Sequence, residues 1–145
     1  MGKDATMSEK LLFTGKTHAS AGPTGAAHSV DGRLDISLPE PHPMAENLFA
    51  AAWSACYLGA LELAAGQRKI KFAGPPSVDT EIKLLHGGPT GFFLKARLDV
   101  TLPGVDEDVA RSLADSAHGI CPYSKAVHGN IEVETNVVAA AKAAA

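Results

Sequence analysis

Cysteine is scarce in this chain, with only two residues, Cys56 and Cys121, among 145. A count so low excludes a small scaffold held together by many disulfides. Positive charge is not in excess either, because the formal net charge is −3, which argues against nucleic acid as the main partner. The first residues lack the charged start and apolar run of a secretory signal peptide. We therefore expect a cytoplasmic protein, and in that reducing compartment two cysteines are more often catalytic, redox-active or metal-binding than structural.

Neither apolar nor charged residues are unusual in number, at 46% and 20% of the chain. The length and this composition predict one globular domain with a real core. We place that domain at residues 11–138. Residues 1–10 are expected to be a disordered or added N-terminal segment, and residues 139–145 form an alanine-rich tail.

The longest apolar stretch spans residues 43–66, P-M-A-E-N-L-F-A-A-A-W-S-A-C-Y-L-G-A-L-E-L-A-A-G. Between positions 46 and 64 its strongly polar residues are few: Glu46, Asn47, Ser54 and Glu62. Good helix formers, Pro43 at the start and Gly66 at the end predict a helix of about five turns. Because it is apolar nearly all round, we expect it to be buried in the core, and its terminal glutamates argue against a membrane span.

The rest of the chain predicts strands and one further helix. The predicted segments are a strand in 10–20, a hairpin at Asp31-Gly32 leading into 33–38, a proline-rich connector at 39–43, strands at 77–86 and 92–102 around a turn at 87–91, a helix from Asp106 with the stripe Val109, Leu113 and Ala117, and a strand at 130–138. The fold class is therefore α+β, with an antiparallel sheet wrapped on the long helix. Since one sheet covers only one side of such a helix, we also expect a homodimer.

Cys121 lies in the segment H-G-I-C-P-Y-S-K-A-V-H-G-N. With Pro122 after it, Cys121 is predicted at the N-cap of a short helix, where free N–H groups favour a thiolate. Three interpretations of the cysteine pair remain open on the residues alone. They are a thiol peroxidase with an attacking and a resolving cysteine, a metal site drawn from His118, Cys121 and His128, and two inert buried thiols.

Two motifs resemble one known family. E-N-L-F-A-A-A-W-S-A-C-Y-L-G-A-L and H-G-I-C-P-Y-S-K-A-V-H-G-N-I-E-V resemble the two cysteine motifs of the Ohr/OsmC family, in its organic hydroperoxide resistance (Ohr) branch, and P-T-G-F-F-L and L-D-V-T-L-P-G-V are similar to it as well. The resemblance runs from about residue 11 to 138. It implies an OsmC-like fold and an intertwined homodimer with two sites at the subunit interface.

The resemblance also implies a chemistry. The family consists of thiol-dependent peroxidases of organic and fatty-acid hydroperoxides, with Cys56 as the attacking cysteine, Cys121 as the resolving cysteine and Glu46 as the catalytic glutamate. Dihydrolipoyl groups on lipoylated proteins are its usual reductant, and we expect no metal and no organic cofactor. Glu46 and Cys56 are ten positions apart, about 15 Å along an unbroken helix, so they meet only if the helix begins after Glu46 or if two chains share each site.

One position departs from the family pattern. The family has an arginine in the glycine-rich loop after the first strand, where it stabilises the thiolate and is held by the glutamate. The segment from Asp31 to Asp35 aligns Pro23 with that arginine, and residues 1–32 contain no arginine. Arg33 and His28 are substitute cations to consider. Without a cation, an apolar site raises the pKa of a cysteine.

We therefore expect a reductase of organic hydroperoxides, whose apolar wall is supplied by Leu48, Phe49, Trp53 and Tyr123. The missing arginine motivates a rival hypothesis. It is a diverged relative with weak peroxidase activity that binds an apolar ligand or senses redox state through the same two thiols.

Overall fold

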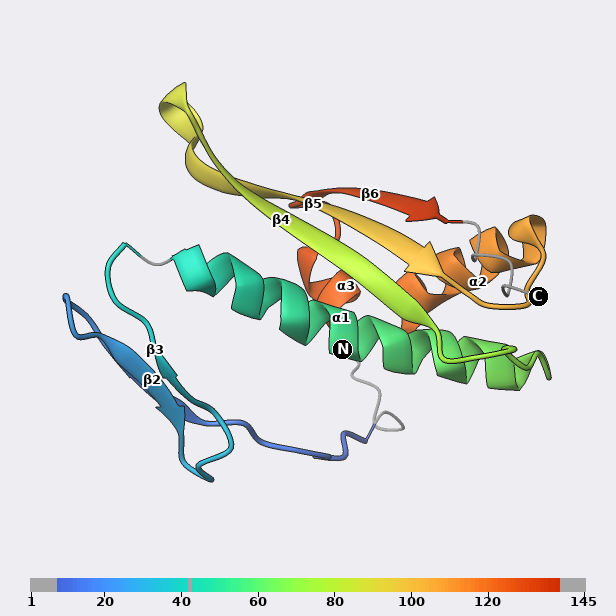
Figure 1. The fold of residues 1–145 in the computed structure, drawn as a ribbon, viewed down its shortest axis with the longest axis horizontal. Coiled ribbons are helices and arrows are strands. Elements are labelled where there is room, and N and C mark those ends of the chain that lie inside the picture. Colours follow the sequence, from blue (N-terminus) through green and yellow to red (C-terminus); the bar gives the residue numbers. More distant parts are fainter. Residues whose placement is uncertain (1–7, 42, 139–145) are drawn as a thin grey trace. The chain divides into compact units, whose positions relative to one another are not determined.

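The computed structural model describes residues 8–41 and 43–138 (Figure 1). They form two compact units, one ending before residue 43 and one beginning there, and each is described by itself. The predicted end segments 1–10 and 139–145 fall largely or wholly outside the described residues.

The first unit is a small antiparallel sheet in the order β1-β2-β3. Its strands are β1 (Thr17–Ser20), β2 (Ala26–Ser29) and β3 (Asp35–Ser37). The Asp31 carboxylate accepts hydrogen bonds from the Ser29 hydroxyl at 2.6 Å and the Arg33 N–H at 3.0 Å. These contacts form the connection between β2 and β3, so the predicted hairpin at Asp31-Gly32 is confirmed. The strand predicted in 10–20 is present only from residue 17, and β2 was not predicted.

A tight turn joins β1 to β2. The Gly25 N–H donates to the Gly22 carbonyl at 2.9 Å, which closes a four-residue turn with Pro23 as its second residue. Proline is favoured at that position because its fixed φ suits the turn. Gly25 has no room for a side chain, since an added Cβ would lie 2.7 Å from the carbonyl oxygens of both Ser20 and Leu38.

The second unit packs three helices on one face of a three-stranded sheet (Figure 1). Its elements are α1 (Pro43–Gln67), β4 (Ser77–Gly87), the 3-10 turn η1 (Gly88–Thr90), β5 (Gly91–Thr101), α2 (Glu107–Ile120), α3 (Pro122–Val127) and β6 (Glu132–Val137). The sheet order is β4-β5-β6. The long helix, the β4–β5 hairpin, the second helix and the last strand are all confirmed, and the structure is α+β as predicted.

The sheet of this unit is mixed, and the prediction of a purely antiparallel sheet was wrong. β4 and β5 pair antiparallel, but β5 and β6 pair parallel, with Leu98 opposite Thr135. The reason is the connection. α2 and α3 carry the chain back to the end at which β5 began, and a crossover of this length joins parallel strands.

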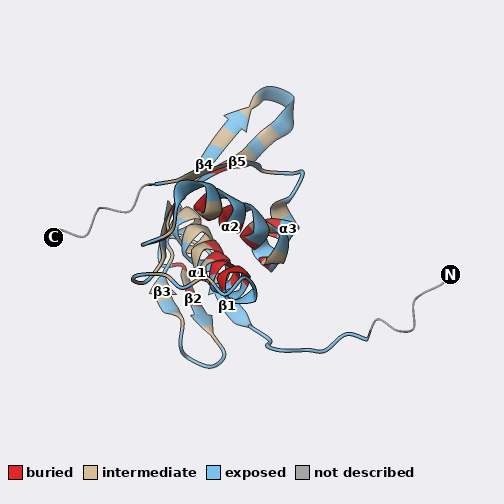
Figure 2. Ribbon diagram, turned by 90° about the vertical axis from the view of Figure 1, so that its right-hand side faces the viewer, coloured by how far each residue is buried: buried red, intermediate tan, exposed pale blue. Residues whose placement is uncertain are grey.

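Helix α1 is buried along one face only within the single chain, as expected if one sheet covers only one side of it (Figure 2). The buried residues on this face are Trp53, Tyr57, Ala60, Leu61, Ala64 and Ala65. On the other side Ala55, Gly59 and Glu62 are exposed, and Leu63 retains 53% of its surface. The sheet, α2 and α3 cover only the buried face. Met44–Gln67 is long and apolar enough to cross a membrane, but that face packs against the sheet and α2, as the core helix of a soluble protein does.

Candidate functional site

Cys121 is the N-cap of α3, as predicted. It follows the last residue of α2, and Pro122 occupies the first turn of α3. Its Sγ accepts a hydrogen bond from the Ser124 N–H at 3.4 Å, and its side chain is fully buried. The free N–H groups of a helix start therefore face this sulfur.

Cys56 lies in the middle of α1, partly buried, and meets Cys121. Both cysteines are free thiols. The Cys121 side chain and the backbone N–H of Tyr123 both lie close enough to the Cys56 thiol to influence its pKa. Two segments separated by more than sixty positions in the sequence thus bring both sulfurs together.

The surroundings of Cys56 favour its neutral form. Burial is the largest influence and raises the pKa of Cys56, and the Cys121 side chain raises it further. The Tyr123 N–H acts in the opposite direction, because it stabilises a thiolate. Within the described part of the chain, no lysine or arginine is among the groups that act on this thiol.

Glu46 is not brought to Cys56 within one chain. α1 begins at Pro43 and runs unbroken to Gln67, so Glu46 is in its first turn. Ten residues at 1.5 Å each place the two positions about 15 Å apart along the axis. The alternative in which the helix begins after Glu46 is therefore excluded.

The four predicted wall residues have different environments. Leu48 and Phe49 are partly buried, and Phe49 packs edge-on against Trp53 with ring centroids 6.0 Å apart. Trp53, one helical turn before Cys56, is fully buried, whereas Tyr123 keeps 47% of its surface exposed. Trp53 and Tyr123 are close to the cysteines through their own segments, and Leu48 and Phe49 extend the apolar surface toward the start of α1.

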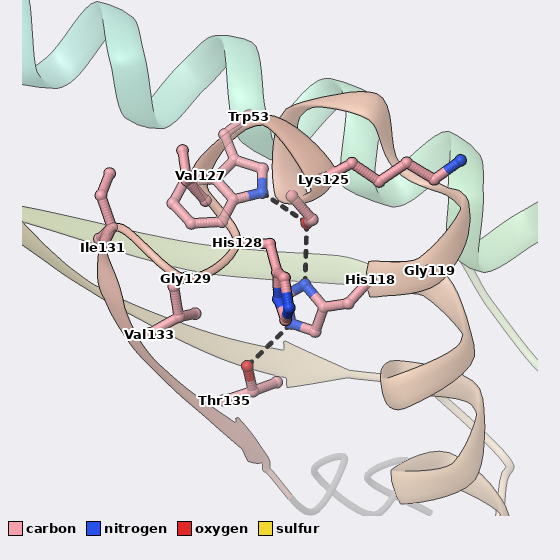
Figure 3. Close-up of a pocket in the computed structure, with 11 residues that line it drawn as sticks. Trp53, His118, Gly119, Lys125, Val127, His128, Gly129, Ile131, Val133 and Thr135 are labelled. Carbon is pink, nitrogen blue, oxygen red and sulfur yellow. Dashed lines mark hydrogen bonds between the residues drawn. The ribbon is translucent and has the colours of Figure 1, made fainter.

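A buried polar network beside the cysteines was missed from the sequence. The indole N–H of Trp53 donates to Ser124 Oγ at 2.9 Å. The same Oγ lies 2.8 Å from His118 Nδ1, and His118 Nε2 lies 2.9 Å from Thr135 Oγ1 (Figure 3). One signal was available, because Thr135 is the only polar residue among the alternating inward positions 131, 133, 135 and 137. No feature of the sequence predicted a role for Ser124.

These residues form one side of a cavity of about 640 Å³ (Figure 3). Its apolar part comes from Trp53, Val127, Ile131 and Val133, and Lys125 and His128 also line it. Of the metal ligands considered above, His118 has both ring nitrogens paired with hydroxyl groups. Among residues 8–41 and 43–138, no three histidine, cysteine or acidic side chains are arranged to hold a metal ion.

The substitute cations belong to the first unit. Arg33 is exposed in the loop between β2 and β3, where its backbone N–H donates to the Asp31 carboxylate. His28, on β2, is also exposed and lies opposite His18 of β1, with ring centroids 5.4 Å apart. Neither residue has a contact in its own unit that reveals a role in thiol chemistry.

The chain is similar to known proteins over most of its length. Residues 38–136 match the family model described as OsmC-like protein. An organic hydroperoxide resistance protein of Xanthomonas axonopodis pv. citri is 37% identical over 134 residues, which cover 86% of this chain and 94% of that protein. The organic hydroperoxide resistance protein OhrB of Bacillus subtilis is 34% identical over 132 residues, covering 85% of this chain and 96% of that protein.

Solved structures also match this chain over most of its length. The crystal structure of an organic hydroperoxide resistance protein from Elizabethkingia anophelis matches with a TM-score of 0.83 and 34% identity, over 90% of this chain and 99% of that one. The structure of Bacillus subtilis OhrB matches with a TM-score of 0.79 and 34% identity, over 88% of this chain and all of that one. From the family model, the relatives and the shared fold, this chain belongs to the OsmC-like family, and within it to the organic hydroperoxide resistance branch.

Proposed function

We propose that this protein is a thiol-dependent peroxidase that reduces organic hydroperoxides to alcohols. The observation that carries the proposal is the proximity of the Cys56 and Cys121 side chains, in a chain whose relatives are named for organic hydroperoxide resistance. Two thiols in contact form a disulfide without a large rearrangement, and that is the step on which a two-cysteine cycle depends.

The cycle has three steps. The Cys56 thiolate attacks the distal oxygen of ROOH, the O–O bond breaks, and the alkoxide takes up a proton and leaves as ROH. Cys56 is then a sulfenic acid. The Cys121 sulfur attacks the Cys56 sulfur, a disulfide forms and water leaves. A dithiol reductant finally exchanges with the disulfide and restores both thiols, and we take dihydrolipoyl groups of lipoylated proteins as that reductant.

The apolar residues around Cys56 select the substrate in this proposal. Phe49 and Trp53 pack together on the same helix as Cys56, and Leu48 and Tyr123 extend this surface. An apolar wall gains free energy by removing an alkyl chain from water, and hydrogen peroxide has no such chain. The proposed substrates are therefore lipid or alkyl hydroperoxides.

A homodimer completes the proposed site. Glu46 and Cys56 lie about 15 Å apart along one unbroken helix, so a shared site takes them from different chains. The uncovered face of α1 favours this arrangement. Ala52, Ala55 and Gly59 present little side-chain bulk there, and Leu63 is half exposed, which suits close packing against a second copy. The proposed location is the cytoplasm.

One observation favours a second function. Burial raises the pKa of Cys56, and no cation of the described residues opposes it. A thiol that stays protonated at neutral pH reacts slowly with peroxide. The second candidate is accordingly a relative with weak peroxidase activity that binds an apolar ligand or senses redox state through the same cysteine pair.

The test measures turnover of cumene hydroperoxide by the reduced protein with dihydrolipoamide as reductant. Wild type is compared with Cys56→Ser and Cys121→Ser. Rapid turnover that is lost in Cys56→Ser supports the peroxidase. Slow turnover by wild type with both thiols intact rejects the peroxidase in favour of the second candidate.

A further inference from the structure

Ser124 uses its backbone and its side chain in the same small volume. It is buried, with 6% of its surface exposed. Its N–H donates to Cys121 Sγ, and its Oγ contacts both Trp53 Nε1 and His118 Nδ1 (Figure 3). Among the described residues, Ser124 alone forms side-chain or backbone hydrogen bonds both to the Cys121 sulfur and to a side chain of the helix that carries Cys56.

Trp53 fixes the direction of one of these hydrogen bonds. An indole N–H only donates, so Ser124 Oγ accepts from it. In the arrangement that we assign, the serine hydroxyl donates its hydrogen to His118 Nδ1, and His118 Nε2–H donates to Thr135 Oγ1. This assignment satisfies every member and requires a neutral imidazole.

The surroundings of His118 keep it neutral. Burial is the main influence and lowers the pKa of His118, although the nearby Asp115 raises it. The Tyr57 ring packs against the imidazole with centroids 4.6 Å apart, and the Tyr57 hydroxyl is fixed by the Ala114 carbonyl at 2.8 Å. Protein groups thus hold His118 from both ring nitrogens and from one face.

Two members of the network are near a cysteine in the sequence. Trp53 precedes Cys56 by three residues on α1, and Ser124 follows Cys121 by three residues at the start of α3. We propose that Ser124, held by His118 and Trp53, is a positioning residue that fixes the Cys121 sulfur against Cys56 and thereby sets the rate of disulfide formation. The inference rests on the proposed function, because it concerns the second step of that cycle.

The step itself is Cys56–SOH plus Cys121–SH giving the disulfide and one water. It requires the two sulfurs to approach from contact to a bond of about 2.05 Å along a restricted direction. A misplacement of about 1 Å in such a step lowers a rate by up to about 100-fold. The attack of Cys56 on peroxide has no such requirement, since the hydrogen bonds of Ser124 go to Trp53, His118 and Cys121 and not to Cys56. The two steps are therefore expected to respond differently to loss of the hydroxyl.

The experiment uses the full chain with Ser124→Ala, Ser124→Thr, His118→Gln and the control Ser116→Ala, an exposed serine on α2. Reduced protein receives one equivalent of cumene hydroperoxide. Peroxide loss is followed directly, and mass spectrometry separates the disulfide from a dimedone adduct of Cys56 sulfenic acid. In Ser124→Ala we expect peroxide loss within about twofold of wild type, disulfide formation slower by about tenfold or more, and accumulation of the adduct. Ser124→Thr retains the hydroxyl and restores the disulfide rate, and Ser116→Ala behaves as wild type.

A second oxidant separates this inference from the proposed function. Diamide accepts two electrons from a thiol pair. One cysteine adds to its N=N bond, and the other displaces the reduced hydrazine as the disulfide forms, without any peroxide. If wild type consumes no cumene hydroperoxide, the peroxidase fails, but slower diamide-driven disulfide formation in Ser124→Ala and His118→Gln still supports the positioning role. Wild-type disulfide rates in both variants with either oxidant overturn it. An equal fall in peroxide loss and disulfide formation also overturns it.

Discussion

The Tyr57 hydroxyl donates a hydrogen bond to the backbone carbonyl of Ala114 at 2.8 Å, which ties α1 to α2 one residue after Cys56. Both partners are buried, and burial raises the pKa of Tyr57, so the phenol stays protonated and able to donate. The helix that carries one thiol is in this way fixed to the helix that leads to the other.

Removing that hydroxyl tests its contribution to stability. Tyr57→Phe keeps the ring against His118 but loses the hydrogen bond, and we expect the free energy of unfolding to fall by about 1 kcal/mol. Urea denaturation followed by circular dichroism measures it. Tyr123→Phe is the matched control, because Tyr123 is exposed and its change should stay within about 0.5 kcal/mol. Equal losses of unfolding free energy in both variants would contradict a stabilising role for the Tyr57 hydrogen bond.

The raised pKa of Cys56 predicts how activity depends on pH. The rate of cumene hydroperoxide consumption should increase with pH from about 7 to above about 8.5, since the thiolate is the nucleophile and the ordinary thiol pKa is about 8.5. Stopped-flow measurement of the second-order rate constant tests this, with Cys56→Ser as the blank. A rate that is already maximal near pH 6 would show that a cation from outside the described contacts lowers this pKa.

The same shift affects stability with a defined sign. Because the folded chain holds the Cys56 proton to higher pH than the unfolded chain, its contribution to stability is constant below about 8.5 and falls as pH rises from there through the folded-state pKa. Comparing the urea midpoints of wild type and Cys56→Ala at neutral and at alkaline pH isolates the contribution of the Cys56 thiol to stability. An increase in their difference with pH would contradict it.

Subunit mixing tests the shared site. Glu46→Gln and Cys56→Ser are each expected to lack activity. In a mixed dimer, one site would combine Cys56 of the first chain with Glu46 of the second and be intact. After unfolding and refolding equal amounts together, activity should return to about a quarter of wild type, since half of the dimers are mixed and each has one intact site. No recovery despite subunit exchange would mean that both residues act within one chain.

A glycine in the turn before α2 is expected to be essential for stability. Gly104 has φ +77°, and an added Cβ would lie 2.7 Å from the Ala73 Cβ. Gly104→Ala should therefore destabilise the protein by about 1–3 kcal/mol in thermal or urea unfolding. Gly66→Ala serves as the control, because Gly66 is exposed in the last turn of α1 with open space around it, and alanine should be neutral or stabilising there.

Local signals explain what the sequence could predict. The length of α1 and the hairpin of β4 and β5 follow from continuous helix formers and regular alternation, and the N-cap at Cys121 follows from the proline after it. β2 was missed because Ala26–Ser29 contains no residue with a strong strand preference. The parallel pairing of β6 depends on where α2 and α3 return the chain, which no local pattern encodes.

The candidate site likewise contains residues that the sequence predicts and residues that only the folded chain reveals. Cys56 and Cys121 were identified from their motifs, and their contact agrees with that expectation. Ser124 was missed because its role arises from partners 6 and 71 positions away, which only the folded chain brings to it. An uncovered side of α1 was expected, but its residues were not predicted, because a uniformly apolar sequence does not reveal which side a single chain covers.

The turn at Gly22–Gly25 has a consequence for how this protein could change. Its closing hydrogen bond joins the backbones of its first and last residues, and the second position of such a turn accepts most residues, not only proline. A single substitution therefore exchanges Pro23 for the arginine that the family pattern has at this position, and the backbone conformation of the turn accepts either residue. Either residue can therefore occupy this position while the turn keeps its closing hydrogen bond.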